Sequence, residues 1–258
     1  MATPPRVLLL EDEGLIRRFV ALALEGLPVV LEEARDLAQA RRILDEADGE
    51  RHLLLITDLM LPDGSGLDLL RELRAGKLRR PPRQVAAFSA GLTPERLAEL
   101  ESLGVARCLP KPVSVHEVAH CVTEALEAVR RAPDSSFGTL PEAFGTAMPD
   151  AEHAAVQEFF AGQRRLFEDF RDGCFKRFGD DAAEGDRAVA DGDLARLRRL
   201  THSLGSVLRL IGQPALSAQA RALEELARCG DPAALHAWPP VAAALVQLAR
   251  GGGLASGR

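Results

Sequence analysis

Residues 53–64 read Leu-Leu-Leu-Ile-Thr-Asp-Leu-Met-Leu-Pro-Asp-Gly, an apolar run that ends in the acidic residue Asp58 and then turns at Pro62 and Gly64. A run of this kind is typical of a buried parallel strand followed by a turn. Its last residue then lies at the carboxyl edge of the sheet, where open α/β sheets build their sites. A single acid at this position could equally cap the next helix or turn. The residues at the other strand ends therefore decide between a functional and a capping role for Asp58.

Three further apolar runs end in residues that suit the same site. They are residues 6–10, followed by Glu11, Asp12 and Glu13; residues 85–88, followed by Ser89; and residues 108–110, followed by Lys111. Because the carboxyl ends of parallel strands meet at one edge, we expect these side chains to converge with Asp58. Clustered carboxylates repel one another, and Mg²⁺ with its oxygen ligands and retained waters suits them best. A phosphoryl group on Asp58 would be held by Mg²⁺, the hydroxyl and the amine.

On these residues, the segment from residue 5 to about residue 130 resembles the receiver domain of a two-component response regulator. The resemblance implies that Asp58 is the phosphoacceptor and that Asp12 and Asp58 bind Mg²⁺. It also implies that Glu11 acts through a metal-bound water. The backbone carbonyl of Met60 is implied as a further ligand.

The same resemblance assigns two more residues. Ser89 matches the family's switch hydroxyl and Lys111 matches its lysine, with a cis peptide bond expected before Pro112. The chain departs from the family pattern at two positions. Glu11 stands where Asp is more usual, which should leave metal binding intact, and Cys108 stands where the family commonly has Tyr or Phe as the moving switch aromatic.

The alternation of apolar strands and amphipathic helices predicts an α/β doubly wound five-stranded parallel sheet, the flavodoxin-like receiver fold, over residues 1–131. The expected strands cover residues 6–10, 29–34, 53–58, 84–89 and 106–109. The expected helices cover residues 14–25, 37–47, 65–75, 93–103 and 114–130.

The pattern changes in the second half of the chain. Residues 132–150 are rich in Pro, Gly, Ser and Thr and predict a linker. Every long segment of residues 151–250 has helical period, which predicts an all-α bundle of about five helices. Asp193 is a candidate helix cap, and Pro214 and Pro232 suit first turns. We expect residues 251–258 to form a disordered tail.

His202 stands out within the predicted bundle. Basic and hydroxyl side chains share its helix face at spacings of three, four and seven residues, namely Arg198, Arg199, Ser206 and Arg209. Neighbouring guanidiniums can neutralise phosphate oxygens, so the arrangement suits an imidazole that accepts a phosphoryl group.

Residues 151–250 resemble the histidine phosphotransfer (HPt) domain, a helical bundle with one phosphorylatable histidine. The matching segments are residues 192–194, 200–204, 211–212 and 222–226. The family usually carries Lys and then Gly three and four residues after the histidine, whereas this chain has Gly205 and Ser206. Gly205 lowers helix stability by up to about 1 kcal/mol relative to Ala. Arg209 or Arg199 could replace the missing ammonium.

Composition limits the class of protein. A length of 258 residues suits two domains, and a net charge of −6 offers no basic footprint for nucleic acid. The four cysteines lack pairing or metal-ligand spacing, so we expect reduced thiols. No apolar run has membrane-spanning length, and the start is too short for a signal peptide, which together favour a cytoplasmic protein without membrane contact. Nucleotide loops, ATP-binding segments and a helix-turn-helix are not found, so we expect neither a kinase nor a DNA-binding protein.

Three hypotheses follow. The leading one is a phosphorelay intermediate, in which a sensor histidine kinase phosphorylates Asp58 and His202 exchanges the phosphoryl group with this receiver, another receiver or an HPt protein. The second is a response regulator whose degenerate bundle is a phosphorylation-controlled binding or dimerisation module, for which Gly205 is the support. The third is a phosphate sink that hydrolyses the phosphoryl group at Asp58.

Overall fold

A computed structural model describes residues 4–46, 50–90, 93–130 and 151–252 of the chain. The predicted linker, residues 132–150, lies outside the described residues. Contacts divide the chain into two units, and each is considered by itself. The first unit comprises Met1–Asp12 with Ala23–Ala154, and the second comprises Glu13–Leu22 with Ala155–Arg258.

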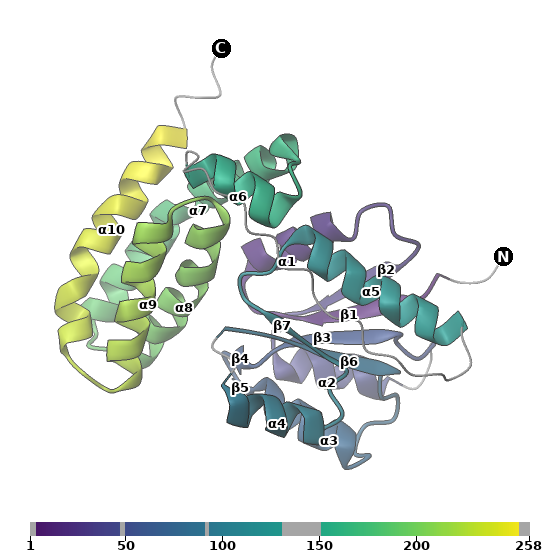
Figure 1. Cartoon of the computed structure of the whole chain (residues 1–258). Helices are drawn as coiled ribbons and strands as arrows, with labels where there is room; N and C mark the ends of the chain where they lie inside the picture. The colour runs from purple at the N-terminus through teal and green to yellow at the C-terminus, as the bar shows by residue number, and fades with distance from the viewer. Residues whose placement is uncertain (1–3, 47–49, 91–92, 131–150, 253–258) are drawn as a thin grey trace. The chain divides into compact units, whose positions relative to one another are not determined.

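The first unit holds a five-stranded parallel sheet, as predicted (Figure 1). Its strands, in spatial order, are β2 (Val30–Ala34), β1 (Arg6–Leu10), β3 (Leu54–Asp58), β6 (Gln84–Ser89) and β7 (Arg107–Pro110). The chain adds β2 on one side of β1 and the later strands β3, β6 and β7 on the other side, so the sheet is doubly wound. The topological switch point, where ligands bind in such sheets, therefore lies between the ends of β1 and β3. A small antiparallel pair, β4 (Met60–Leu61) and β5 (Gly64–Ser65), follows β3.

The register of the sheet aligns the strand ends that the sequence singled out. Leu10 of β1 lies opposite Thr57 of β3, so Glu11 follows β1 at the level where Asp58 ends β3. Asp58 lies opposite Phe88, one residue before Ser89. Ser89 in turn lies opposite Pro110, one residue before Lys111. The sheet therefore brings four strand ends to one edge.

Helices cover both faces of this sheet. They are α2 (Leu37–Asp45), α3 (Gly66–Arg74), α4 (Pro94–Ser102) and α5 (Val115–Arg130). Helix α1 (Gly14–Ala23) falls almost wholly in the second unit. Figure 1 shows α2, α3 and α4 on one face and α5 on the other. On the first face Leu8, Leu10 and Leu55 pack in one buried cluster with apolar residues of α2 and α3. Alternate strand residues point to the opposite face, which is why the strands are apolar along their whole length.

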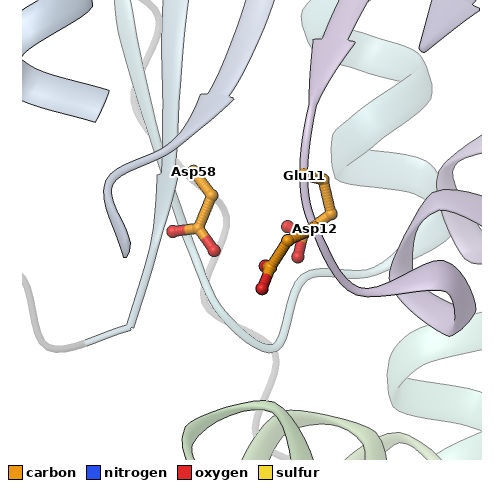
Figure 2. Close-up of side chains that lie close together, drawn as sticks. All are labelled: Glu11, Asp12 and Asp58. Carbon is orange, nitrogen blue, oxygen red and sulfur yellow. The ribbon is translucent and has the colours of Figure 1, made fainter. Parts of the chain in front are cut away.

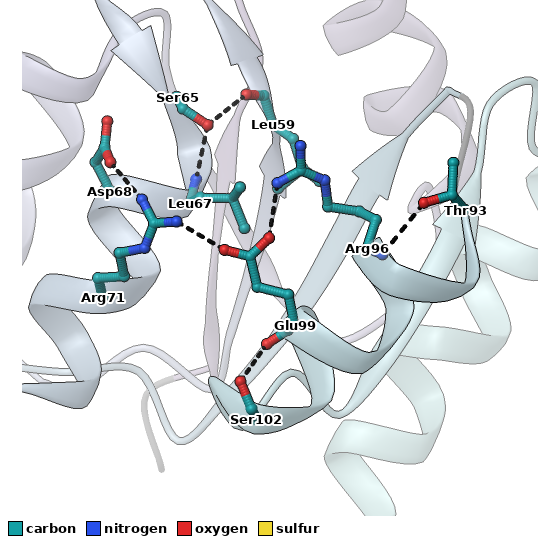
Figure 3. Close-up of polar contacts among 9 residues, drawn as sticks. All are labelled: Leu59, Ser65, Leu67, Asp68, Arg71, Thr93, Arg96, Glu99 and Ser102. Atoms are coloured by element: carbon teal, nitrogen blue, oxygen red, sulfur yellow. Dashed lines mark hydrogen bonds and ion pairs between the residues drawn. The ribbon is translucent and has the colours of Figure 1, made fainter.

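Helix α4 has the fewest apolar anchors of this face, with Leu100 as its one buried residue. Polar contacts tie it to α3 (Figure 3): Arg71 of α3 donates to Glu99 of α4 at 2.7 Å, and Arg96 donates to the same carboxylate at 2.9 Å. Exposed ion pairs of this kind stabilise by at most about 1 kcal/mol each. α4 is therefore held more loosely than the neighbouring helices.

The second half of the described chain contains five helices, as predicted: α6 (Ala151–Phe160), α7 (Arg164–Ala190), α8 (Leu194–Leu210), α9 (Pro214–Arg228) and α10 (Ala233–Gly252). The Asp193 side chain caps α8 by accepting from the Arg196 N–H at 2.9 Å, and Pro214 lies in the first turn of α9. Helix α10 continues to Gly252, two residues into the predicted tail. Residues 253–258 lie outside the described residues. In the described residues no helix is long and apolar enough to cross a membrane.

Helices α7 and α10 pack closely where Trp238 lies against Gly185. Trp238 is fully buried, and its indole Nε1–H donates to the Asp186 carboxylate at 2.9 Å. A Cβ atom on Gly185 would lie 2.0 Å from an indole ring carbon. A glycine at this position is therefore required by packing.

Replacing Gly185 by Ala should destabilise the bundle. The added methyl group would force apart α7 and α10, and overpacking of this kind lowers the free energy of unfolding by about 1–3 kcal/mol. Gly179→Ala in the same helix is the matched control, since a Cβ there meets nothing within 4 Å, and it should raise stability by up to about 1 kcal/mol. Trp238 is the chain's one tryptophan, so its fluorescence during urea unfolding reports both changes. Equal midpoints for the two variants would contradict the packing argument.

Candidate functional site

Three carboxylates from two strand ends face one another (Figure 2). Glu11 and Asp12 directly follow β1, and Asp58 is the last residue of β3. One ligand oxygen of each lies within 4.8 Å of the others. Glu11 and Asp58 are each 1 % exposed, whereas Asp12 is half-buried. This acidic cluster is open to solvent mainly on the side of Asp12.

Lys111 lies between two of these carboxylates. Its ammonium donates to Glu11 Oε2 at 2.6 Å and to Asp58 Oδ2 at 2.7 Å, and it lies 4.6 Å from the centre of the Phe88 ring. The peptide bond between Lys111 and Pro112 is cis, as predicted. Burial disfavours the charged amine, but the Asp58 and Glu11 carboxylates outweigh it and raise the pKa of Lys111. The lysine therefore stays protonated.

The surroundings of Glu11 shift its pKa. Burial, together with the charges of Asp58 and Asp12, raises the pKa of Glu11 to about 8, although Lys111 acts in the opposite direction. The three side chains of the acidic cluster offer hard carboxylate oxygens as ligand atoms. This donor set fits a small divalent cation such as Mg²⁺.

The backbone around Asp58 is tightly arranged. Asp58 Oδ1 accepts from the Met60 N–H at 3.0 Å, and its carbonyl accepts from the Thr57 hydroxyl at 2.8 Å. A Cβ on Gly66 would lie 2.0 Å from the Asp58 carbonyl oxygen, so only glycine lets α3 begin this close to β3. The structure thus gives Met60 an N–H contact to the carboxylate; its carbonyl as a metal ligand stays a prediction.

Ser89 and Cys108 lie on the two strands beyond β3. Ser89 ends β6, is 8 % exposed, and donates to the Ala90 carbonyl at 3.2 Å. Cys108 is half-buried in β7 and packs against the apolar cluster between the sheet and α3 and α4. Burial raises the pKa of its thiol. A small, neutral thiol therefore occupies the position where the resembled family has a large aromatic ring. All four cysteines are free, as expected from their spacing.

His202 is a buried residue in the middle of α8. Its Nδ1 lies 2.7 Å from Glu224 Oε1 on α9, and its Nε2 is buried without a hydrogen-bond partner among the described residues. A carboxylate only accepts hydrogen bonds, so this contact favours the tautomer with Nδ1–H as donor, which leaves the lone pair of the imidazole on Nε2. Glu224 belongs to the segment 222–226 that resembles the HPt family, but its pairing with His202 was not predicted, because the pair joins two helices across 22 residues.

The structure places the other residues predicted around His202 at different depths. Arg199 is exposed, and Ser206 is only 2 % exposed. Arg209 is exposed, pairs with Glu158 at 3.3 Å, and lies 5.8 Å from the centre of the Phe159 ring. Arg198 has a buried Nε without a partner among the described residues.

Two family models match this chain. Residues 7–123 match the response regulator receiver domain, and residues 155–251 match the Hpt domain. Protein PetR of Rhodobacter capsulatus is 32 % identical over 219 residues, which cover 77 % of this chain and 88 % of PetR. The response regulator protein PilR of Pseudomonas aeruginosa is 31 % identical over 121 residues, which cover 47 % of this chain and only 26 % of PilR.

Solved structures match the first half of the chain. The crystal structure of a response regulator receiver protein from Pseudomonas putida is 30 % identical; the match covers 48 % of this chain and 99 % of that chain, with a TM-score of 0.43. The signal receiver domain of a putative Luxo repressor protein from Vibrio parahaemolyticus is 24 % identical, with 49 % of this chain covered, 93 % of that chain covered and a TM-score of 0.44.

Replacing Lys111 by Met should destabilise the first unit. The change leaves Glu11 and Asp58 buried without their ammonium, and breaking a buried ion pair in this way lowers the free energy of unfolding by about 3–5 kcal/mol. Circular dichroism during urea unfolding without divalent cations measures the loss. Lys77→Met is the control, since Lys77 is exposed, and it should change stability by less than about 0.5 kcal/mol. Equal stability of the two variants would show that Lys111 does not neutralise the acidic cluster.

Proposed function

Because the chain belongs to the response regulator receiver family and carries an Hpt domain after its receiver domain, we propose that it is a phosphorelay intermediate. In this proposal a sensor histidine kinase phosphorylates Asp58, and His202 exchanges the phosphoryl group with this receiver, another receiver or an Hpt protein. Both domains are signalling modules of two-component phosphorelays, which act with histidine kinases or other relay proteins.

The observation that carries the proposal is the state of the His202 ring. Nδ1 is held by Glu224 at 2.7 Å, and Nε2 has no partner in the described residues. A histidine kept only for packing has no need of a carboxylate that selects one tautomer. A phosphoryl acceptor does need it, because the reacting nitrogen must carry the lone pair and the other must keep its proton.

At the receiver, an oxygen of Asp58 attacks the phosphorus of the kinase's phosphohistidine. The O–P bond forms, the P–N bond breaks, and the kinase imidazole leaves with the electron pair. Lys111 already donates to Asp58, and its ammonium and the Ser89 hydroxyl both donate to the phosphoryl oxygens. Asp12, Asp58, the Met60 carbonyl and, through a water, Glu11 would hold Mg²⁺. This ion neutralises phosphoryl charge when bound.

At the bundle, the neutral Nε2 of His202 attacks the phosphorus of an aspartyl phosphate. The N–P bond forms, the O–P bond breaks, and the aspartate leaves as a carboxylate. The product ring is cationic, and the Glu224 carboxylate stabilises its Nδ1–H. Arg199, Ser206 and Arg209 are the proposed neighbours of the phosphoryl group, although Arg209 must leave Glu158 to reach it.

One observation favours a second candidate. His202 is 8 % exposed and its Nε2 is shielded from solvent, so side chains around it must shift before a phosphoryl donor can reach it. A bundle that never opens there would serve as a binding or dimerisation module controlled by Asp58. The two candidates differ in whether phosphate ever appears on His202.

Labelling with a phosphorylated sensor kinase tests the relay. We expect alkali-labile label on Asp58 that needs Mg²⁺, and alkali-stable label on His202 once a phosphorylated receiver is supplied. Asp58→Asn should abolish the first and His202→Ala the second. The exposed residues Asp68 and His236 give matched controls, Asp68→Asn and His236→Ala, which should label normally. Absence of label on His202 from every receiver would exclude the relay and leave the binding module.

Mg²⁺ should stabilise the receiver domain. A ligand that binds only the folded state at about 100 times its Kd raises the free energy of unfolding by about 2.7 kcal/mol. Thermal unfolding with and without Mg²⁺ measures the change. Asp12→Asn removes a proposed ligand and should remove most of the shift, whereas the distant Asp68→Asn should keep it. If Mg²⁺ raises the unfolding temperature of Asp12→Asn as much as that of the parent protein, the cation binds elsewhere.

A further inference from the structure

Helix α9 approaches α8 very closely at Gly205, one helical turn after His202. The Ser217 hydroxyl of α9 donates to the Gly205 carbonyl at 2.6 Å. A Cβ on Gly205 would lie 3.1 Å from Cγ, 3.6 Å from Nε and 3.9 Å from Cδ of Arg221. The stem of Arg221 therefore lies across Gly205, in the space that a side chain at position 205 would need.

Arg221 also lies on the face of α9 that meets His202. It precedes Glu224 by three residues, so the two side chains are neighbours on one helix face, and Glu224 reaches the His202 ring. Gly205 follows His202 by three residues on α8, which places their Cβ positions roughly 5–6 Å apart. The guanidinium of Arg221 extends from a stem beside Gly205 and can thus reach a group bound to His202.

The charge of Arg221 is not used elsewhere in the described part of the chain. Arg221 is exposed and makes no ion pair or hydrogen bond with any described residue. Three other arginines of the bundle are paired: Arg209 with Glu158, Arg196 with Glu184, and Arg228 with Glu225. A guanidinium without a partner is available to an anion that arrives from outside.

We propose that Arg221 of α9 is a further cation that binds the phosphoryl group on His202, beside the neighbours proposed on α8, and that Gly205 is the gap in α8 through which it does so. The inference rests on the proposed function, since it names a phosphate-binding residue of the same site. Arg221 donates to the phosphoryl oxygens in a bidentate way while Glu224 holds Nδ1–H. The two residues thus stabilise opposite charges of the phosphorylated ring, anionic oxygens and a cationic imidazole.

Phosphoramidate tests this without any partner protein. Nε2 attacks its phosphorus, the N–P bond to His202 forms, the original P–N bond breaks, and ammonia leaves. The experiment uses the full chain with Asp58→Asn, so that alkali-stable label reports His202. Arg221→Ala should slow labelling by on the order of tenfold to a hundredfold, as expected for the loss of one hydrogen-bonded charged group. Arg221→Lys should keep most of the rate.

Two further variants separate phosphate binding from structure. Arg228→Ala removes an exposed arginine of the same helix that is already paired with Glu225, and it should label at the parent rate. Gly205→Lys combined with Arg221→Ala puts an ammonium into the vacated space, and it should recover at least part of the rate. A purely structural role for Arg221 would not be rescued by a charge supplied from the other helix.

The outcomes distinguish the two proposals. Equal rates for the parent, Arg221→Ala and Arg228→Ala would overturn the role of Arg221 while leaving the relay intact. Labelling by phosphoramidate that depends on Arg221, without transfer from any phosphorylated receiver, would overturn the relay and keep Arg221 as a phosphate-binding residue. A parent protein that takes no label from phosphoramidate would overturn both.

Discussion

Lys111 lies between Glu11 and Asp58 with almost no water around it, at 2.6 and 2.7 Å from their oxygens. The receiver domain is arranged around this contact, because two buried carboxylates repel each other strongly in a medium of low dielectric. A third carboxylate, that of Asp12, lies within 4.8 Å of the pair. Three carboxylates this close together suit a bound divalent cation.

The two proposed phosphoacceptors solve opposite electrostatic problems. The Asp58 carboxylate is an anion that must react with an anionic phosphoryl group. It is accordingly surrounded by the Lys111 ammonium, the Met60 N–H and carboxylate oxygens suited to a metal ion. The imidazole of His202 carries positive charge once it is phosphorylated, and its partner is a carboxylate, Glu224. A phosphoryl group passes between such sites reversibly when both environments stabilise the phosphorylated state to a similar extent.

Sequence reasoning predicted most of the receiver because its elements are local. Each strand is a short apolar run, and the residues after Leu10, Phe88 and Pro110 share one edge by the rules of parallel sheets. The bundle was predicted only in outline, since helical period does not say which faces meet. The pairing of Glu224 with His202 was not predicted because the two residues lie on different helices. Residues 251–258 were predicted to be a disordered tail, whereas α10 continues to Gly252.

Gly205 shows why an isolated departure from a family pattern is hard to interpret from sequence. Considered on α8 alone, Gly205 replaces the lysine of the family pattern and lowers the stability of the helix. In the structure it can be compared with Gly66 of α3 and Gly185 of α7, because at all three positions another group lies close to where a Cβ would be. At Gly66 and Gly185 that group is a backbone carbonyl or an indole ring, which cannot move aside. At Gly205 it is the flexible stem of a charged side chain, so the same absence that weakens α8 admits a cation from α9.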